Sequence, residues 1–242
     1  EISECLVGSE MCIRDRRQLS AAGKESPNMA VLTIRQQLYR TLKQRILDGV
    51  YPPGAHLNID IIAKEQGVSN SPLREAMTLL VKDRLVENRP NAGMYVIEIT
   101  PQLYRELVDT INIWIEGAYR LCLKYGKTEC LLALMEERLR ALKKVIRRGT
   151  DRERIFAILD FQRCFVTATE NKVFISSFSS EFDRLCLAYY YNHLGREIDW
   201  DINVQRAATI IDAVKSGLVD AVSDMIWTWS VPHFEANQIP EE

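Results

Sequence analysis

The chain has 242 residues, of which 47% are hydrophobic and 26% charged, and its formal net charge is −2. This composition excludes collagen-like, low-complexity and wholly disordered proteins, and the length allows one large domain or two smaller ones. Its apolar stretches are far shorter than the roughly 18 to 20 residues that cross a bilayer, and it opens on no signal-peptide core. We therefore expect a cytoplasmic protein with reduced cysteines and no membrane partner.

The first thirty residues show no sustained hydrophobic period. We expect residues 1–30 to form a disordered tail or an artefactual extension. The string from Cys5 to Arg16 is similar to the peptide that a translated sequencing adapter would give, which places the native start near Met29. A packed fold is expected only from residue 31 onward.

Residues 31–100 predict three helices followed by a hairpin. Apolar residues at helical spacing give a first helix that stops at Gly49, and a second short helix of about 59–65 is closed by Gly67. The third helix starts within Val68-Ser-Asn-Ser-Pro72, where a side-chain oxygen can cap the helix and the proline suits its first turn. Apolar residues then flank the turn 88–93, as two short strands would.

The remainder, residues 101–236, predicts an all-helical domain. Thr100-Pro101 is a typical helix start, and glycines or Asn171 separate the later apolar periods. The expected helices are about 101–125, 128–148, 151–170, 172–193, 202–216 and 218–234. The predicted fold is mainly α: an N-terminal winged helix-turn-helix followed by a six-helix antiparallel bundle.

Two helices joined by a tight Gly-Val-Ser turn form a helix-turn-helix pattern, whose second helix can enter the DNA major groove. Small residues at its start, Ser69, Asn70 and Ser71, would let the backbone approach phosphate, and the outward Arg74 could reach a guanine edge. The hairpin with Arg89 would form a wing. The structural alternative is that any three-helix unit has one solvated face.

Three sequence blocks strengthen the DNA-binding interpretation. Residues 46–54, 67–76 and 85–96 resemble the GntR family of bacterial transcription regulators, in the family's order and spacing. The helical remainder resembles the FCD effector domain of the FadR subfamily, most clearly at 161–171 and 217–225. The resemblance implies DNA contacts from the matching positions, namely Ser69, Asn70, Ser71 and Arg74, with Gly93 as the wing glycine.

Three positions depart from the family pattern. Asn70 and Ala92 stand where the family commonly has arginine, and Asp60 occupies a position that can be a basic contact. Phosphate contacts are therefore expected to be fewer. Asn70 could instead recognise adenine, because an amide offers one donor and one acceptor to that base.

The FCD resemblance also implies a metal site of one Asp and three His, which this chain lacks. Ile158 stands at the Asp position, and Gln162, Gln205 and Trp229 stand at the His positions. These groups are poor or impossible ligands for zinc-class metals. We therefore expect neither a metal nor another cofactor.

The polar bundle residues Asn112, Gln162 and Gln205 are expected to face inward, which leaves two interpretations. They satisfy one another in a closed core, or they line a metal-free pocket with Ile158 and Trp229 for a small organic effector. A carboxylate is one candidate effector class, because the bundle also carries arginines that could pair with one. These are Arg120, Arg163, Arg184 and Arg206.

The leading functional hypothesis is a homodimeric transcription regulator, by default a repressor, that binds a palindromic double-stranded operator and responds to the effector. One alternative is a helical-domain enzyme, but the common catalytic motifs are missing and Asp160 and Glu170 are lone carboxylates, so no catalytic residue is assigned. The other alternative is a structural or interaction dimer with a degenerate DNA-binding face.

Overall fold

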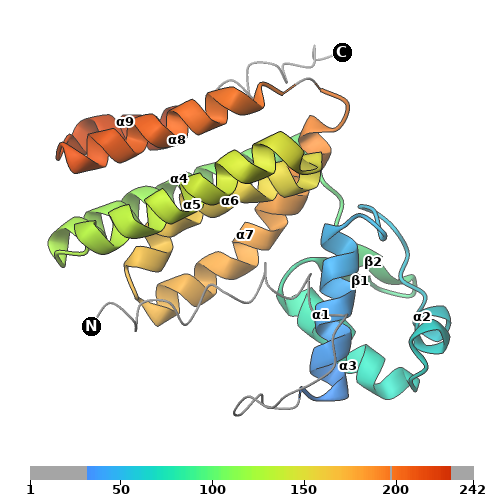
Figure 1. The fold of residues 1–242 in the computed structure, drawn as a ribbon. Coiled ribbons are helices and arrows are strands. Elements are labelled where there is room, and N and C mark those ends of the chain that lie inside the picture. Colours follow the sequence, from blue (N-terminus) through green and yellow to red (C-terminus); the bar gives the residue numbers. More distant parts are fainter. Residues whose placement is uncertain (1–31, 197, 230–242) are drawn as a thin grey trace, which may run out of the picture. The chain divides into compact units, whose positions relative to one another are not determined.

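A computed structural model describes residues 32–196 and 198–229. The helices and strands from α1 to α9 belong to one compact unit that begins at Ile34 (Figure 1). The expected tail, residues 1–30, lies outside the described part of the chain. Within that part, no helix is both long and apolar enough to cross a membrane.

The N-terminal elements follow the predicted order of three helices and a hairpin. They are α1 (Ile34–Leu47), α2 (Ile59–Gln66), α3 (Asn70–Lys82), β1 (Val86–Arg89) and β2 (Gly93–Val96). The strands are antiparallel, with Val86 opposite Val96 and Arg89 opposite Gly93. This arrangement confirms the predicted winged helix-turn-helix.

Local side chains fix the two helices that form the helix-turn-helix. The side chain of Asn58 accepts hydrogen bonds from the first backbone N–H groups of α2. Gly67 ends α2 in the left-handed conformation, with φ of 65°. Helix α3 then packs its apolar face into the core, where its fully buried side chains are Leu73, Ala76, Met77 and Leu80.

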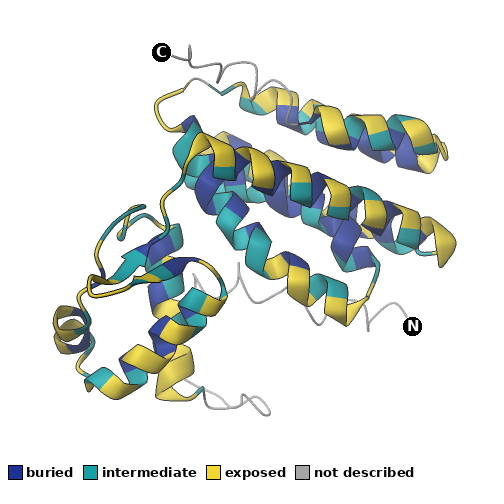
Figure 2. Cartoon of the chain, turned by 180° about the vertical axis from the view of Figure 1, so that it is seen from behind, coloured by how far each residue is buried: buried dark blue, intermediate teal, exposed yellow. Residues whose placement is uncertain are grey.

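Six helices follow and form the bundle. They are α4 (Pro101–Lys124), α5 (Thr128–Arg148), α6 (Asp151–Ala168), α7 (Lys172–His193), α8 (Trp200–Lys215) and α9 (Val219–Thr228). The predicted start at Thr100 is confirmed, because this residue caps α4. Helix α6 begins with a capping box of Thr150 and Glu153. Exposed and buried residues alternate around these helices, as amphipathic helices require (Figure 2).

Helix α7 belongs to the bundle but also contributes to the core of the N-terminal elements. Leu187 is 1% exposed and lies in the same apolar cluster as Leu42 and Ile46. Close by, Lys43 of α1 forms an ion pair of 2.5 Å with Asp183 of α7. A change in the position of α7 would therefore directly alter the packing of the three-helix core.

Candidate functional site

The start of α3 presents small polar groups. Ser69 is the N-cap residue, and its hydroxyl makes no capping hydrogen bond. Ser69 and Ser71 are exposed, whereas Pro72 fills the first turn. Uncapped backbone N–H groups and the positive end of the helix dipole together favour a nearby anion.

Arg74 lies one turn further along and is exposed. It forms no ion pair with any carboxylate of the described residues. Its neighbour Glu75 pairs instead with Arg35, at 3.6 Å. Its positive charge is therefore not neutralised by a described carboxylate. It lies near the start of α3, the helix that the sequence predicts to enter the DNA major groove.

Asn70 and Asp60, two of the positions that depart from the family pattern, are hydrogen-bonded to each other. The Asn70 amide Nδ2 donates to the Asp60 carboxylate at 2.7 Å. Asp60 is therefore not simply a repulsive charge in the position of a basic contact. It holds the amide of Asn70 in one orientation.

Lys64 is a candidate contact that sequence reasoning missed. It follows Asp60 by four residues on α2, so both side chains share one helix face. Asp60 touches the start of α3, and Lys64 is exposed without an acidic partner among the described residues. The four-residue spacing from Asp60 was the signal that could have found it.

The wing arginine, Arg89, is held by one carboxylate of its own hairpin and by another just beyond it. Its guanidinium hydrogen-bonds to Glu98 at 2.9 Å and also to Glu87, and both contacts raise the pKa of Arg89. It also stacks over the Tyr95 ring, 4.4 Å from the centroid. A phosphate contact would require Arg89 to leave both carboxylates.

Gly93, at the start of β2, has a structural reason to be glycine. Its φ is +100°, which side chains rarely adopt, and a Cβ there would lie 3.0 Å from His56 Nε2. His56 in turn packs against the Tyr95 ring, with centroids 4.9 Å apart. The wing is thus shaped by close packing at its base.

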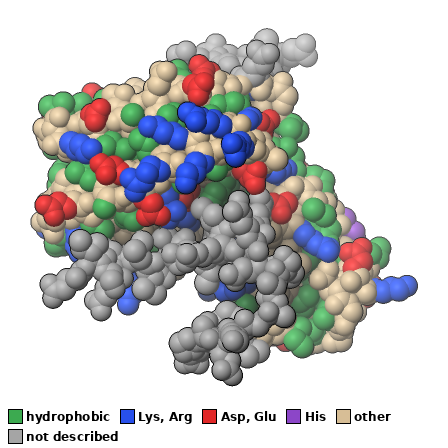
Figure 3. All heavy atoms as spheres, in the orientation of Figure 1, with side chains coloured by type: hydrophobic (Ala, Val, Ile, Leu, Met, Phe, Trp, Pro, Cys, Tyr) green, Lys and Arg blue, Asp and Glu red, His purple; other side chains and the backbone are tan. Residues whose placement is uncertain are grey.

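The outer face of α5 carries a cluster of exposed cations that form no close ion pair within the described residues. They are Arg140, Lys143, Lys144, Arg147 and Arg148. Figure 3 shows Lys and Arg side chains gathered over the bundle. The bundle therefore carries positive surface charge of its own, apart from the winged-helix elements.

Four of the five expected effector residues are buried in the bundle, and one is not. Asn112, Ile158, Gln162 and Trp229 are at most 9% exposed. Gln205 is exposed, so its expected inward position is wrong. The buried face of α8 instead includes Asn203, Ala207 and Ile210. Gln205 follows Asn203 by two positions, so its side chain points away from that face.

Trp229 lies beside two groups that the sequence did not connect with it. Its ring stacks on Phe161, with centroids 5.9 Å apart. The guanidinium of Arg206 donates to the Trp229 carbonyl at 3.1 Å. Among the described residues, the buried indole Nε1 of Trp229 has no hydrogen-bond partner, and the same holds for the side-chain oxygen of Asn203.

Arg206 is also the only one of the four expected bundle arginines without a carboxylate partner in the described chain. Arg120 pairs with Glu116 at 2.8 Å, and Arg184 pairs with Glu181 at 2.5 Å. Arg163 contacts Asp160. These three cations are already neutralised, so Arg206 is left as the candidate for an anionic ligand.

Asp160 is not the lone carboxylate that the sequence indicated. Its side chain is 5% exposed and forms ion pairs with Arg163 and with Arg138 of α5, whose Nε lies at 3.1 Å. The arginine on α5 is 22 positions away along the chain, so local spacing did not reveal it. The two arginines give Asp160 a structural role in joining α5 to α6.

The described residues contain no group of three or more His, Cys, Asp or Glu side chains placed to hold a metal. His193 is buried, and its Nδ1 lies 2.7 Å from the Tyr189 carbonyl. Its ring stacks on Tyr189, with centroids 4.1 Å apart. Burial lowers the pKa of His193, so its neutral form is favoured.

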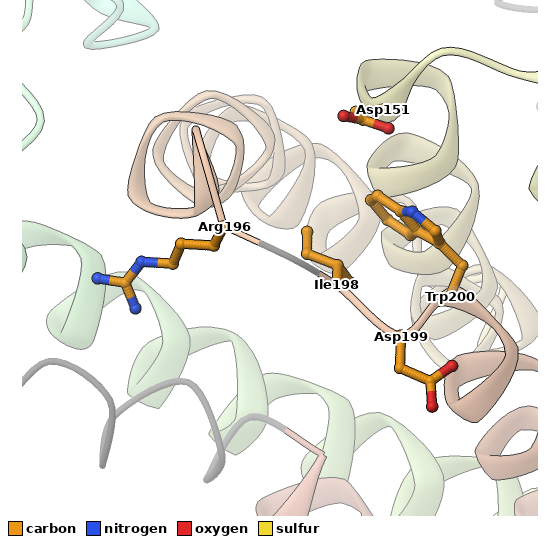
Figure 4. A pocket seen from close by; sticks show the side chains of 5 residues that line it. All are labelled: Asp151, Arg196, Ile198, Asp199 and Trp200. Carbon is orange, nitrogen blue, oxygen red and sulfur yellow. The ribbon is translucent and has the colours of Figure 1, made fainter.

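A surface hollow of about 570 Å³ lies where the α7–α8 connection meets the start of α6. Its lining residues are Asp151, Arg196, Ile198, Asp199 and Trp200, and none of them is an expected effector residue. Arg196 and Asp199 point away from Trp200 rather than toward a common centre (Figure 4). Asp199 also caps α8. The hollow therefore lacks the convergent polar groups of a ligand site.

Comparisons with known proteins match both halves of the chain. Residues 34–96 match the family described as bacterial regulatory proteins of the gntR family, and residues 120–228 match the FCD domain. The E. coli protein McbR/YncC has a similar fold, with a TM-score of 0.67 and 19% identity over 85% of this chain and 99% of that one.

Two curated relatives from bacteria are also similar. The Bacillus subtilis regulator YdhC is 35% identical over 116 residues, which are 48% of this chain and 51% of that protein. The E. coli repressor RspR is 34% identical over 67 residues, 28% of this chain and 29% of that protein. The chain thus spans about half the length of YdhC, and less of RspR. Together with the two domain matches, these similarities show that the chain belongs to the GntR family of bacterial regulatory proteins, with an FCD domain following its winged helix-turn-helix.

Proposed function

We propose that this protein is a cytoplasmic transcription repressor that binds a palindromic DNA operator as a homodimer and releases it in response to a small organic effector. The observation that carries the DNA-binding part is Arg74, exposed at the start of α3 without an acidic partner among the described residues. An arginine in this place can make a bidentate contact with guanine.

The surrounding residues support the same placement of α3 in the major groove. Ser69 and Ser71 are small enough for phosphate to approach the helix start, where the dipole favours an anion. The β1–β2 hairpin, with Gly93 at the start of β2, would supply the wing. Lys64 adds a cation on the α2 face that adjoins α3, which favours contact with the flanking backbone.

The proposed DNA binding is tested by selecting bound duplexes from a random pool at low and at higher salt. We expect an enriched palindrome with half-sites one helical turn apart. Arg74→Ala should weaken binding to that operator by about 1–3 kcal/mol, because a specific base contact is lost. Arg40→Ala is the matched control, since this exposed arginine lies on α1.

The outcomes of the selection separate the alternatives. Enrichment of a palindrome that Arg74→Ala no longer recognises supports the regulator. Binding that vanishes with salt and shows no preferred sequence would favour an interaction dimer with a degenerate DNA-binding face. The enzyme alternative gains no support from Asp160, because this carboxylate forms ion pairs with two arginines.

For the effector, we propose a small carboxylate held beside Trp229 without a metal. Two hydrogen-bond donors support this choice. In the part of the chain that the structure describes, the guanidinium of Arg206 has no carboxylate partner and the Trp229 indole N–H has no acceptor. Gln162 and Asn112 supply buried amides in the same bundle. Buried polar atoms without partners are rare in closed cores, and a ligand would satisfy them.

The effector proposal is tested by measuring thermal unfolding with a panel of small carboxylates and sugar acids. A binder should raise the unfolding temperature of the wild-type protein, because a ligand that binds only the folded state stabilises it. Arg206→Gln should abolish this increase, whereas Arg140→Gln, an exposed arginine on α5, should retain it. An equal increase in both variants would rule out Arg206 as the carboxylate partner.

Helix α7 is the proposed route from effector to DNA. It supplies Leu187 to the core of the N-terminal elements and Asp183 to Lys43 of α1. An effector that favours one position of α7 would bias the spacing of the recognition helices. The similarity to the repressor RspR supports repression as the direction of control.

A further inference from the structure

Two arginines in the first turn of α6 each bind the end of another helix. Arg154 donates from Nε to the Ile146 carbonyl near the end of α5, at 3.1 Å. Arg152 donates from Nη1 to the Leu47 carbonyl at the end of α1. Arg154 therefore joins two helices of the bundle, whereas Arg152 joins the bundle to the first helix of the winged helix-turn-helix.

The turn that follows α1 leaves the Leu47 carbonyl without a backbone donor among the described residues. The carbonyls before it, those of Gln44, Arg45 and Ile46, accept backbone N–H groups from residues 48–51. The last carbonyls of a helix carry a partial negative charge and lack partners within the helix. A guanidinium is therefore a favourable partner for Leu47, and α6 supplies it.

The guanidinium of Arg152 also contacts two tyrosines at the end of α7. Its carbon lies 3.5 Å from the centre of the Tyr190 ring, and its Nη2 lies 3.4 Å from the Tyr191 hydroxyl. Tyr190 packs against the apolar cluster of the bundle, and Tyr191 packs against that of the winged helix. The nearby carboxylate of Asp151 pairs with Arg154 instead, at 3.1 Å. Arg152 therefore binds α1 at the place where the two cores meet.

Gly49 leaves room for this guanidinium because it has no side chain. Its φ is +76°, which side chains rarely adopt. A Cβ there would overlap the guanidinium of Arg152 and lie 3.0 Å from the Tyr191 hydroxyl. Gly126, by contrast, has a φ of +65° and no heavy atom within 4 Å of where its Cβ would stand. Gly49 therefore serves the contact with Arg152 as well as the backbone turn.

We propose that Arg152 is a positioning residue that fixes the winged helix on the bundle and thereby sets the spacing of operator half-sites that the dimer accepts. The proposal rests on the dimeric operator binding of the proposed function. Each base pair added between two half-sites moves them apart by about 3.4 Å and rotates one against the other by about 35°. A winged helix that is fixed on its bundle resists this change, whereas a released one follows it.

The test compares the affinity of the full chain for the selected palindrome with its affinity for versions that have two base pairs added or removed between the half-sites. The wild type should discriminate against both altered spacings. Arg152→Ala should reduce this discrimination about tenfold, because a charge-assisted hydrogen bond and a cation–π contact are lost. A general loss of stability would instead weaken binding at every spacing by the same factor.

A conservative variant shows which property of Arg152 matters. Arg152→Lys keeps the positive charge, but an ammonium lacks the planar fork that donates to a carbonyl while it stacks on a ring. We therefore expect this variant to recover only part of the wild-type discrimination between spacings. Circular dichroism and the unfolding temperature establish that each variant folds.

Two matched controls are available on the same chain. Arg154→Ala removes the same kind of contact from the same turn of α6, but its partner lies within the bundle, so the spacing preference should stay unchanged. Gly49→Ala should relax the preference as Arg152→Ala does, because the new Cβ displaces the guanidinium. Gly126→Ala introduces only the backbone strain and should retain the preference.

Hydrogen exchange of the full chain gives a readout that does not depend on DNA. In Arg152→Ala, the backbone amides of residues 48–51 should exchange about tenfold faster, because the end of α1 loses its partner and opens more often. In Arg154→Ala, the faster exchange should be confined to the end of α5. Mass spectrometry of peptides that cover the two helix ends separates these effects.

Three results would overturn the proposal: an equal loss of affinity at every spacing in Arg152→Ala, the same relaxation in Arg154→Ala, or unchanged exchange at residues 48–51 in Arg152→Ala. Each of them leaves the regulator intact if the wild type selects a palindrome. A wild type that selects no palindrome removes the regulator. Faster exchange at residues 48–51 in Arg152→Ala would then still support the anchoring of the winged helix by this arginine.

Discussion

The side-chain amide of Asn70 donates a 2.7 Å hydrogen bond to Asp60, which joins the start of α3 to the first turn of α2. An amide nitrogen carries two protons, and Asp60 takes one of them. The second proton and the amide oxygen remain for a base. This pair of groups matches the acceptor and donor on the major-groove edge of adenine.

We predict that Asn70→Ala lowers the preference for adenine at one operator position by about 1–3 kcal/mol. Asp60→Ala should also lower this preference, because the amide loses its fixed orientation. It should nevertheless preserve or raise the total affinity, since one negative charge near phosphate is removed. The measurement is the affinity of each variant for the selected operator and for its single base substitutions.

Arg40→Ala on α1 is the control for this experiment and should leave the profile of base preference unchanged. An Asn70→Ala variant that keeps the wild-type preference at every operator position would show that Asn70 does not contact a base. In that case its bond to Asp60 serves only to hold α2 against α3.

The second prediction concerns the buried ion pairs of Asp160. Asp160→Asn should lower the free energy of unfolding by about 3–5 kcal/mol, because Arg138 and Arg163 would keep their charges without the carboxylate. Urea unfolding followed by circular dichroism measures the loss. Glu136→Gln removes the exposed partner of Lys215 and should hardly move the unfolding midpoint. Equal effects of the two variants would contradict a structural role for Asp160.

Most of the fold could be predicted from the sequence because its signals are local. Thr100 with Pro101 marks the start of α4, Thr150 starts α6, and Gly67 ends α2, each through contacts within a few residues. The buried stripes follow the same helical period. Local periodicity therefore predicts the helix ends within a few residues, except for the expected end of the last helix at 234, which lies outside the described residues.

The parts of the site that could not be predicted depend on partners far apart in the sequence. Arg89 was expected to be free for phosphate, but Glu98 reaches it from beyond the second strand. Asp160 meets Arg138 on another helix. The family resemblance implies an inward Gln205, but α8 buries Ala207 and exposes Gln205 to solvent. A one-dimensional pattern contains neither these pairings nor the exact rotation of a helix.

The third prediction is that Gly93→Ala destabilises the wing, by about 1–3 kcal/mol. Two effects contribute: the left-handed backbone at φ +100°, and the 3.0 Å approach of the new Cβ to His56 Nε2. Adding His56→Ala should recover the stability that is lost to the steric contact. The loss caused by the backbone conformation should remain. Urea unfolding of the single and double variants measures both contributions. A Gly93→Ala variant as stable as the wild type would show that the wing tolerates another backbone conformation there.

The last prediction concerns pH and follows from the burial of His193. Burial lowers the pKa of His193 in the folded protein, and the nearby charge of Arg196 acts in the same direction, although the bond to the Tyr189 carbonyl opposes both. In the unfolded chain the imidazole titrates near its ordinary value of about 6.5. As the pH falls below that value, the imidazole is protonated in the unfolded state but stays neutral in the folded state. The free energy of unfolding should therefore decrease with falling pH, by at most about 1.4 kcal/mol per unit.

Urea unfolding between neutral pH and the folded pKa of His193 measures this slope. His193→Gln cannot take up the proton, so its unfolding free energy should lose this part of the pH dependence even if the variant is less stable throughout. His56→Gln changes an exposed histidine and should retain the wild-type slope. If His193→Gln and the wild type show the same slope, the acid sensitivity arises from other groups, and the buried imidazole stacked on Tyr189 does not control it.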